Sequence, residues 1–308
     1  MQVEGLEMAP YLAAVQGPRT VFDDHNVEYE LQQRAWLTDR REPLRAHAAA
    51  YSLIQWRRLR RWEATVCARA SAALAVSERD ARQLEALSGR SVATVENGID
   101  LGRVPYRPPT EPITEELLFD GTMSFRPNQD AALWFAREIL PLIRRVRPAA
   151  RFWVVGRDPS PRLTRLNFEP RGVAVTGTVV STAPYWQRAG IYVLPMRMGG
   201  GVRFKALEAM AHGLPLVSTA LGVEGTGAHP DVDYLAAERP AEFAAAVICL
   251  LDDAGLRRRL AAHARETVAA LDWSRIAPRL LAVYAGVGGP AAAGADADPA
   301  RPWVTVAP

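Results

Sequence analysis

The sequence predicts an α/β protein with two Rossmann-like lobes, each built on a parallel sheet, and with an N-terminal lobe that is incomplete. Short apolar runs alternate with segments of helical period, which is the pattern of strands joined by crossover helices. A segment with four prolines, residues 101–116, separates two such series and indicates a linker between domains. The 308 residues suffice for two ordinary domains, each with its own hydrophobic core.

The composition is typical of a soluble globular protein, with 49% hydrophobic and 23% charged residues. No run of eighteen apolar residues indicates a membrane span, and residues 1–17 lack the pattern of a signal peptide. The two cysteines, Cys67 and Cys249, indicate a reducing compartment, so we expect a cytoplasmic protein. A net charge of only +3 argues against a nucleic-acid-binding protein.

The N-terminal lobe, residues 1–100, is expected to contain about three strands. Strands are predicted at 20–24, 72–76 and 91–95, and helices at 28–36, 43–70 and 78–87. Ser77 is a good N-cap for the third helix, and Asn97-Gly98 is a turn signal after the last strand. A doubly wound nucleotide-binding domain usually has five or six strands. Either this chain lacks a half-lobe, or a partner covers the exposed edge of the sheet.

The C-terminal lobe, residues 117–272, has the pattern of a complete Rossmann-like unit. Its strands are predicted at 117–120, 151–155, 173–176, 191–194 and 215–218. Its helices are predicted at 128–146, 182–188, 202–212, 240–252 and 255–271. A last helix, 273–285, is expected to cross back to the first lobe. The Gly-, Ala- and Pro-rich residues 286–308 are expected to form a disordered tail.

Three glycines, Gly199, Gly200 and Gly201, lie between a predicted strand end and a predicted helix start. Free N–H groups and the dipole at a helix N-terminus attract phosphate, and glycines let the backbone approach the anion closely. Arg203 and Lys205 add positive charge there, and Lys205 shares a helix face with Glu208. This set suits a nucleoside diphospho-sugar. A glycine-rich turn before an ordinary helix with an exposed Lys–Glu pair explains the spacing equally well.

The stretch around this loop resembles the donor-binding core of glycosyltransferase family 4, retaining enzymes with the GT-B fold. The stretch is Val193–Gly225, VLPMRMGGGVRFKALEAMAHGLPLVSTALGVEG. Other segments resemble the same family in the same order: VFDDHNVEYE at 21–30, VSERD at 76–80, VENGID at 95–100, LFDGTMSFRPN at 118–128, WVVG at 153–156 and Thr176-Gly177. The resemblance extends over roughly residues 5–285.

The resemblance implies a role for each matching residue. Lys205 and Arg203 would face the diphosphate, and Glu208 would hydrogen-bond the nucleotide ribose. The backbone would contribute through glycines and one threonine: Gly199, Gly200, Gly201, Gly121 and Thr122 near the phosphates, and Gly156 and Gly177 near the base. His25 would approach the donor sugar from the N-terminal lobe, so the implied catalytic residues are His25, Lys205 and Glu208.

The resemblance also implies a reaction. A sugar would pass from a nucleoside diphospho-sugar to a glycan or lipid-linked acceptor, as in the synthesis of cell-envelope polysaccharides, with retention at the anomeric carbon. The mechanism would be front-face, without a covalent enzyme nucleophile. Cationic side chains and helix dipoles would hold the leaving diphosphate, so neither a metal nor another cofactor is expected.

Two departures from the family pattern leave a second interpretation open. Many members carry two glutamates separated by seven residues, and Gly200 stands where the first would fall before Glu208. The glycine-rich strand–loop–helix that opens full members has no match in this chain. The chain is therefore also interpretable as a catalytically silent or partner-dependent subunit that binds nucleotide-sugars, with a companion chain that completes the first lobe.

A basic cluster with neighbouring tryptophans lies on the long predicted helix of the first lobe: Arg57, Arg58, Arg60 and Arg61, with Trp56 and Trp62. It suits a peripheral contact with anionic lipid at the inner face of a membrane. It also suits nucleic acid, although no nucleic-acid partner is expected at this net charge. A solvated helix face whose arginine stems cover apolar surface is the simpler interpretation.

The remaining titratable candidates have ordinary explanations as well. His25 follows Asp23 and Asp24 at a predicted strand end, where a histidine is either a site residue or a satisfied polar group. Asp24 and Glu28 are explained as acidic residues favoured near a helix N-terminus, or as general bases or orienting groups. The other histidines have no ligand spacing with cysteine or acidic residues, and no protein-bound metal is predicted. They are His47, His212, His229 and His263.

Overall fold

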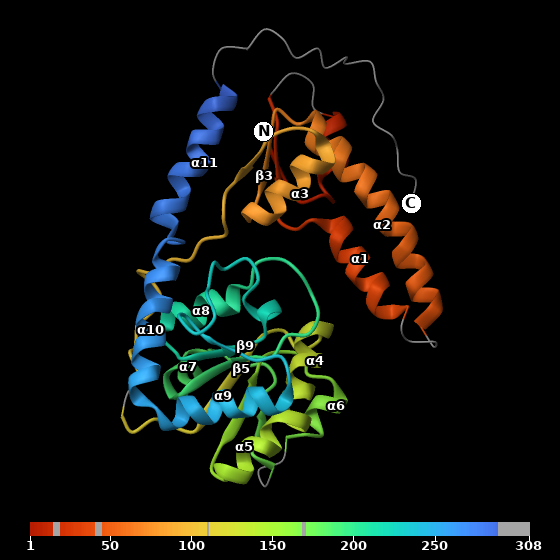
Figure 1. Cartoon of the computed structure of the whole chain (residues 1–308). Helices are drawn as coiled ribbons and strands as arrows, with labels where there is room; N and C mark the ends of the chain where they lie inside the picture. The colour runs from red at the N-terminus through yellow and green to blue at the C-terminus, as the bar shows by residue number, and fades with distance from the viewer. Residues whose placement is uncertain (15–18, 41–44, 110, 168–170, 289–308) are drawn as a thin grey trace. The chain divides into compact units, whose positions relative to one another are not determined.

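The computed structural model describes residues 1–14, 19–40, 45–109, 111–167 and 171–288. The chain forms two compact units (Figure 1). The first contains residues 1–97 together with the residues from 274 onward, and the second contains residues 98–273. None of the described helices is long and apolar enough to cross a membrane.

The second unit is built on a sheet of six parallel strands. They are β5 (Glu116–Asp120), β6 (Arg151–Val155), β7 (Val173–Val175), β8 (Ile191–Leu194), β9 (Leu216–Ser218) and β10 (Leu235–Ala236). Their order in the sheet is β10-β9-β8-β5-β6-β7. The chain thus winds outward from β5 in one direction and from β8 in the other, which is the doubly wound Rossmann arrangement. The short edge strand β10 was not predicted from the sequence.

Helices follow the strands of this unit. They are α4 (Arg126–Trp134), the π-helical turn η3 (Phe135–Ile139), α5 (Leu140–Val146), α6 (Pro161–Thr164), α7 (Ala183–Arg188), α8 (Phe204–His212), the 3-10 turn η5 (Ala220–Val223), α9 (Pro240–Asp252) and α10 (Ala254–Ala269). The helix predicted over 128–146 is interrupted by η3. Pro141 has no backbone N–H to donate to Arg137, and this local change of hydrogen bonding accommodates it.

Each face of this sheet has its own aromatic packing. The register places Phe152 beside Leu117 on one face, and Trp153 beside Leu118 and Tyr192 on the other. On the first face the Phe135 ring lies 4.4 Å from Phe152 between centroids. Because both faces are covered, β8 is buried at every residue, as is usual for a parallel sheet.

The proline-rich segment predicted as a linker packs on the second unit. The Arg107 N–H donates to the His212 carbonyl at 2.9 Å. The buried Arg257 guanidinium donates to the Leu251 carbonyl at 3.1 Å and also pairs with Glu111. Buried arginine is costly unless its donors are satisfied, so these bonds fix the segment against α9 and α10.

The first unit contains a sheet of four parallel strands and the helices packed with it. The strands are β1 (Gln2–Glu4), β2 (Val21–Asp24), β3 (Ala72–Ala75) and β4 (Val92–Thr94), in that order. The helical elements are the 3-10 turn η1 (Ala9–Ala14), α1 (Glu28–Asp39), α2 (Ala46–Arg69), α3 (Glu78–Ser88) and α11 (Trp273–Gly288). Strand β1 adds to the three predicted strands, and it was missed because its three residues show no resolvable alternation.

Local sequence signals in the first unit agree with their structures. The Ser77 hydroxyl caps α3 by accepting a hydrogen bond from the Asp80 N–H at 3.1 Å, which confirms the predicted N-cap. The last helix, α11, belongs to this unit from Ser274 onward, and Arg279 pairs with Glu96 at 2.6 Å. Residues 286–288, predicted as the start of a disordered tail, are helical, and residues 289–308 lie outside the described residues.

Candidate active site

The candidate site lies at the carboxyl edge of the second unit's sheet, between β5 and β8. These are the two central strands, from which the chain winds in opposite directions. Strand β5 ends at Asp120, and the loop that follows β8 leads through Gly199–Gly201 into α8. Because all the strands are parallel, both segments open on the same edge. Ligands of open α/β sheets bind in such a crevice.

Lys205 is the central cation of this site. It lies in the first turn of α8, and its Nζ donates to the Asn128 Oδ1 at 2.7 Å. The same nitrogen lies 4.7 Å from the centroid of the Phe119 ring. Burial lowers the pKa of Lys205 to about 8, and attraction by the Asp120 carboxylate opposes the shift. Lys205 is therefore still mostly protonated at neutral pH, as a partly desolvated cation.

Asn128 connects Lys205 to the loop after β5. Its side chain is buried, and its Nδ2 donates to the Thr122 carbonyl at 2.9 Å. One amide therefore satisfies Lys205 with its oxygen and fixes the 121–122 backbone with its nitrogen. Asn128 was predicted only as the first residue of a helix. It closes the LFDGTMSFRPN segment, but nothing in the sequence alone indicates that it contacts Lys205.

Asp120, the last residue of β5, is the anionic partner on the other side of Lys205. Its Oδ1 accepts a hydrogen bond from the Tyr192 hydroxyl at 2.6 Å, and the Trp186 side chain also bonds to it. The Trp186 ring stacks on Tyr192, with centroids 4.9 Å apart. Burial raises the pKa of Asp120, while these bonds and Lys205 lower it. Asp120 was not among the predicted site residues.

Two of the predicted glycines are required by close approach at this edge. A Cβ on Gly121 would lie 2.2 Å from the Lys205 Nζ, and a Cβ on Gly156 would lie 1.8 Å from the Gly121 carbonyl oxygen. Their φ angles of 140° and 145° also disfavour any residue with a side chain. The carboxyl ends of strands β5 and β6 can therefore meet beside Lys205 only because residues 121 and 156 are both glycine.

Arg203 and the glycine loop lie together at the N-terminus of α8. Arg203 is the N-cap residue, and its Nε donates to the Leu221 carbonyl at 3.1 Å. A Cβ on Gly199 would lie 3.1 Å from one guanidinium nitrogen, so the guanidinium lies against the loop. The Arg203 charge also lowers the pKa of Lys205. The structure thus brings together two cations, glycine backbone and a helix N-terminus, which is the combination that binds phosphate.

Glu208 lies one turn further along α8 and is exposed. Partial desolvation of its carboxyl, followed by repulsion from Asp120, raises the pKa of Glu208 to about 7, although Lys205 lowers it. Because it is exposed, this carboxyl can accept hydrogen bonds from a ligand's hydroxyl groups.

The residues predicted to lie near the base follow the neighbouring strands along the same edge. Gly156 follows β6 and Gly177 follows β7. The Gly156 N–H donates to the Thr176 hydroxyl at 3.3 Å, which ties these two strand ends together. Thr122 is fixed from the same side, because its hydroxyl accepts from the Arg157 Nε at 3.3 Å. With strands about 4.8 Å apart, Gly177 is about 10 Å along the edge from β5.

His25 belongs to the first unit, where it follows β2 and is exposed. Its Nε2 lies 4.0 Å from the Glu4 Oε2, and its Nδ1 lies 4.0 Å from the Asp23 Oδ1. Its approach to a donor sugar stays a prediction. Among the described residues, no group of three or more His, Cys, Asp or Glu side chains is placed to hold a metal ion.

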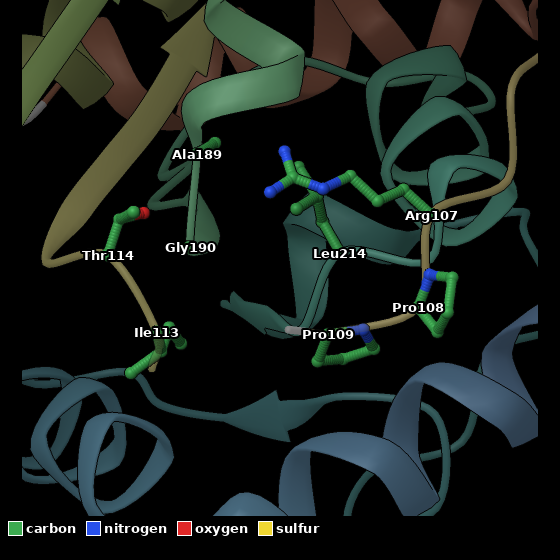
Figure 2. Close-up of a pocket in the computed structure, with 8 residues that line it drawn as sticks. All are labelled: Arg107, Pro108, Pro109, Ile113, Thr114, Ala189, Gly190 and Leu214. Carbon is green, nitrogen blue, oxygen red and sulfur yellow. The ribbon is translucent and has the colours of Figure 1, made fainter. Parts of the chain in front are cut away.

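A pocket elsewhere in the second unit is a poor candidate for the same chemistry (Figure 2). It is lined by Arg107, Pro108, Pro109, Ile113, Thr114, Ala189, Gly190 and Leu214. Thr114 and Gly190 precede β5 and β8, so the pocket lies at the amino edge of the sheet, opposite the glycine loop. Only Arg107 brings charge to its lining.

Comparison with known proteins places a recognised domain over this site. Residues 114–253 match the family model described as "Glycosyl transferases group 1". D-inositol 3-phosphate glycosyltransferase 1 of Catenulispora acidiphila is 34% identical over 101 residues, which cover 32% of this chain and 24% of that protein. An uncharacterized 44.6 kDa protein in the cps region of Klebsiella pneumoniae is 24% identical over 142 residues, or 43% and 36% of the two chains. The chain thus matches about a quarter to a third of the length of these relatives.

Solved structures match most of this chain and give the fold. TarM superposes with a TM-score of 0.71 at 12% identity, covering 92% of this chain and 54% of its own. Sucrose-phosphate synthase from Thermosynechococcus elongatus gives 0.67 at 20% identity, over 93% and 73%. HepE of Anabaena, in complex with UDP, gives 0.68 at 14% identity, over 92% and 78%. The fold is therefore GT-B-like, as the sequence predicts, with parallel sheets in both units.

The lowered pKa of Lys205 can be checked by amine labelling, because the chain contains no other lysine. Acetylation by a dilute anhydride follows the fraction of neutral amine, so the rate at Lys205 should reach half its maximum near pH 8. Mass spectrometry of peptides gives this rate, and the Met1 amine serves as the internal control. Pyrophosphate should slow labelling of Lys205 and leave Met1 unchanged. A midpoint near 10.5, the ordinary value, would rule out the buried position of this amine.

Proposed function

We propose that this chain provides the donor site of a retaining glycosyltransferase of family 4, which transfers a sugar from a nucleoside diphospho-sugar to an acceptor. One observation carries the proposal. A partly desolvated Lys205, held by Asn128 and Asp120, lies beside the glycine loop and the N-terminus of α8. The match of residues 114–253 to group 1 glycosyl transferases supports it.

Stabilisation of the leaving diphosphate is the main catalytic contribution in this proposal. Charge accumulates on the diphosphate as the glycosidic bond breaks, and a preformed cation in a desolvated site stabilises that charge better than water does. The Arg203 charge, the loop amides of Gly199–Gly201 and the dipole of α8 act on the same anion. No metal or other cofactor is needed for this step in the proposal.

In the proposal the other residues take the roles that the resemblance to family 4 implies. Glu208 accepts hydrogen bonds from the ribose, Gly121 and Thr122 approach the phosphates, and Gly156 and Gly177 leave room for the base. His25 acts on the donor sugar. The sugar is transferred with retention on the face from which the diphosphate departs, without a covalent intermediate on the protein.

A catalytically silent or partner-dependent subunit is the second candidate, and Gly200 favours it. Members of family 4 often carry a glutamate at this position that contacts the donor sugar, and glycine has no side chain for that contact. In this candidate the site binds the nucleotide-sugar, and turnover requires a companion chain that extends the four-stranded sheet of the first unit.

The acceptor in the proposal is a glycan or a lipid-linked sugar, and α2 supplies a peripheral contact with the inner face of the membrane. Arg57, Arg58, Arg60 and Arg61 are all exposed on this helix. Tyr51 and Ile54, one turn apart, are 62% and 57% exposed and extend the same surface. An apolar patch followed by arginines suits an anionic bilayer, because the apolar side chains insert while the cations meet phosphate.

Calorimetric titration with UDP, GDP and ADP tests the donor site, and Lys205→Met isolates its cation. One diphosphate should bind, and the substitution should weaken it about 10- to 100-fold, because a charge-assisted hydrogen bond is lost. Affinity for the corresponding nucleoside should not change. Arg145→Met, which removes an exposed cation from α5, is the matched control. Equal losses for diphosphate and nucleoside would exclude a phosphate contact. Release of diphosphate from the matching nucleotide-sugar then separates the enzyme from the silent subunit.

If Glu208 binds the ribose, substitution of Glu208 should weaken the discrimination between ribonucleotides and deoxyribonucleotides. Glu208→Gln should reduce the preference for the ribonucleotide over its 2′-deoxy analogue, because a neutral amide accepts hydroxyl hydrogen bonds more weakly than a carboxylate. The comparison needs the affinities of both nucleotides for both proteins at pH 8, above the pKa of about 7. An unchanged ratio of affinities would remove Glu208 from the ribose site.

Vesicle sedimentation tests the proposed membrane contact. The protein should sediment with vesicles of phosphatidylglycerol and remain in solution with phosphatidylcholine, and raised salt should weaken the binding. Arg57→Glu with Arg58→Glu and Arg61→Glu should abolish sedimentation. The control reverses the exposed Arg137 and Arg145 of the other unit. Equal binding by the two charge-reversed proteins would show that α2 is not the contact surface.

A further inference from the structure

The turn between β2 and α1 carries His25, and a buried carboxyl from another helix meets its far end. Glu63 of α2 is 0% exposed. Its two oxygens accept hydrogen bonds from the first N–H groups of α1, Glu28 at 2.6 Å and Tyr29 at 3.0 Å. The N-cap residue, Val27, has no side chain that can do this. Glu63 therefore caps α1 from outside the helix.

The same carboxyl also meets the near end of the turn. Asp24, the last residue of β2, is 2% exposed, and its side chain hydrogen-bonds to Glu63. Two carboxyls form such a bond only when one of them carries a proton. Burial and then the charge of Glu63 raise the pKa of Asp24 well above its usual range. Burial raises the pKa of Glu63 to about 7, although the hydrogen bonds from Tyr29, Glu28 and Asp24 lower it. Both shifts favour keeping a proton in the bond between the two carboxyls.

The surroundings of the pair favour this shared proton. The charged groups that act on it are acidic: Glu28 from α1 and Asp80 from α3. On α2 itself, the buried Cys67 thiol has its pKa raised to about 12 and stays neutral. The two N–H groups of α1 and the positive end of its dipole stabilise the one negative charge that remains. No neighbouring cation neutralises the pair among the groups that shift these two pKa values.

We infer that Glu63 is a positioning residue for His25, because it is bonded on both sides of the three-residue turn, at Asp24 and at Glu28 and Tyr29. An exposed turn closed only by backbone would let the imidazole sample many orientations. Closed by one buried side chain, it has a defined start and end. We call these bonds of Glu63, to Asp24 before the turn and to Glu28 and Tyr29 after it, the clamp. The inference rests on the proposed role of His25 toward the donor sugar, but the clamp itself lies within the first unit.

Loss of the clamp should affect the chemical step and leave donor binding intact. Glu63→Ala removes both sets of bonds. Glu63→Gln keeps one acceptor for α1 and an amide donor for Asp24, so it should retain most of the bonds to the turn. It is the variant to measure if Glu63→Ala fails to fold. Glu78→Ala, which removes an exposed carboxyl at the start of α3, is the matched control.

The experiment uses the full chain and reads the clamp and the activity separately. In Glu63→Ala, amide exchange at Glu28 and Tyr29 should accelerate at least tenfold, and the His25 ring resonances, assigned with His25→Gln, should shift. The affinity for UDP or the preferred diphosphate should stay within twofold. Where the wild type turns over, kcat should fall at least tenfold with KM for the donor unchanged, and Glu63→Gln should restore most of it.

Three results would overturn the inference: unchanged exchange at Glu28 and Tyr29, unchanged His25 resonances despite faster exchange, or an unchanged kcat once the clamp is lost. Absence of turnover in the wild type would count against the proposed enzymatic function instead. The His25 resonances would then decide the positioning role alone, because they report the turn directly.

Discussion

The structure of the candidate site depends on one constraint, which is the accommodation of a single lysine charge away from water. The pKa of Lys205 falls from 10.5 to about 8, which corresponds to a charging cost of about 3 kcal/mol. This net cost already includes the attraction of Asp120, and Asn128 accepts a hydrogen bond from the buried amine. Gly121 and Gly156 follow from the same constraint, since any side chain there would occupy the space of the amine or of the adjoining backbone.

A cation that is partly desolvated in the free protein interacts more strongly with a bound anion than a fully hydrated cation does. Binding of a diphosphate would return the favourable interaction that desolvation removes, and it would do so in a low-dielectric setting where charge interactions are strong. The position at the switch between β5 and β8 adds the N-terminus of α8 and the loop amides to the same anion. In the first unit another buried side chain organises a turn in a similar way, because Glu63 accepts hydrogen bonds from the Glu28 and Tyr29 N–H groups that follow His25.

Much of this was predictable from local sequence, and the remainder was not for identifiable reasons. Apolar runs that end at Gly121, Gly156 and Gly177 predicted three strand ends on one edge, because the carboxyl ends of parallel strands lie at the same edge of a sheet. Strands β1 and β10 were not predicted, because two or three residues are too few to show an alternation of apolar and polar side chains. The roles of Asn128 and Glu63 were not predicted, because they come from contacts between segments far apart in the chain. Asn128 is 77 residues from Lys205, and Glu63 is 35 residues from Glu28.

The most direct test of the central claim is a crystal structure of the chain with the nucleoside diphosphate that it binds best. A phosphate oxygen should lie within hydrogen-bonding distance of the Lys205 Nζ, with the diphosphate over Gly199–Gly201 at the start of α8 and the ribose at Glu208. A diphosphate bound anywhere else, or one bound at this edge while Lys205 contacts only Asn128, would contradict the assignment of Lys205 as the diphosphate-binding cation.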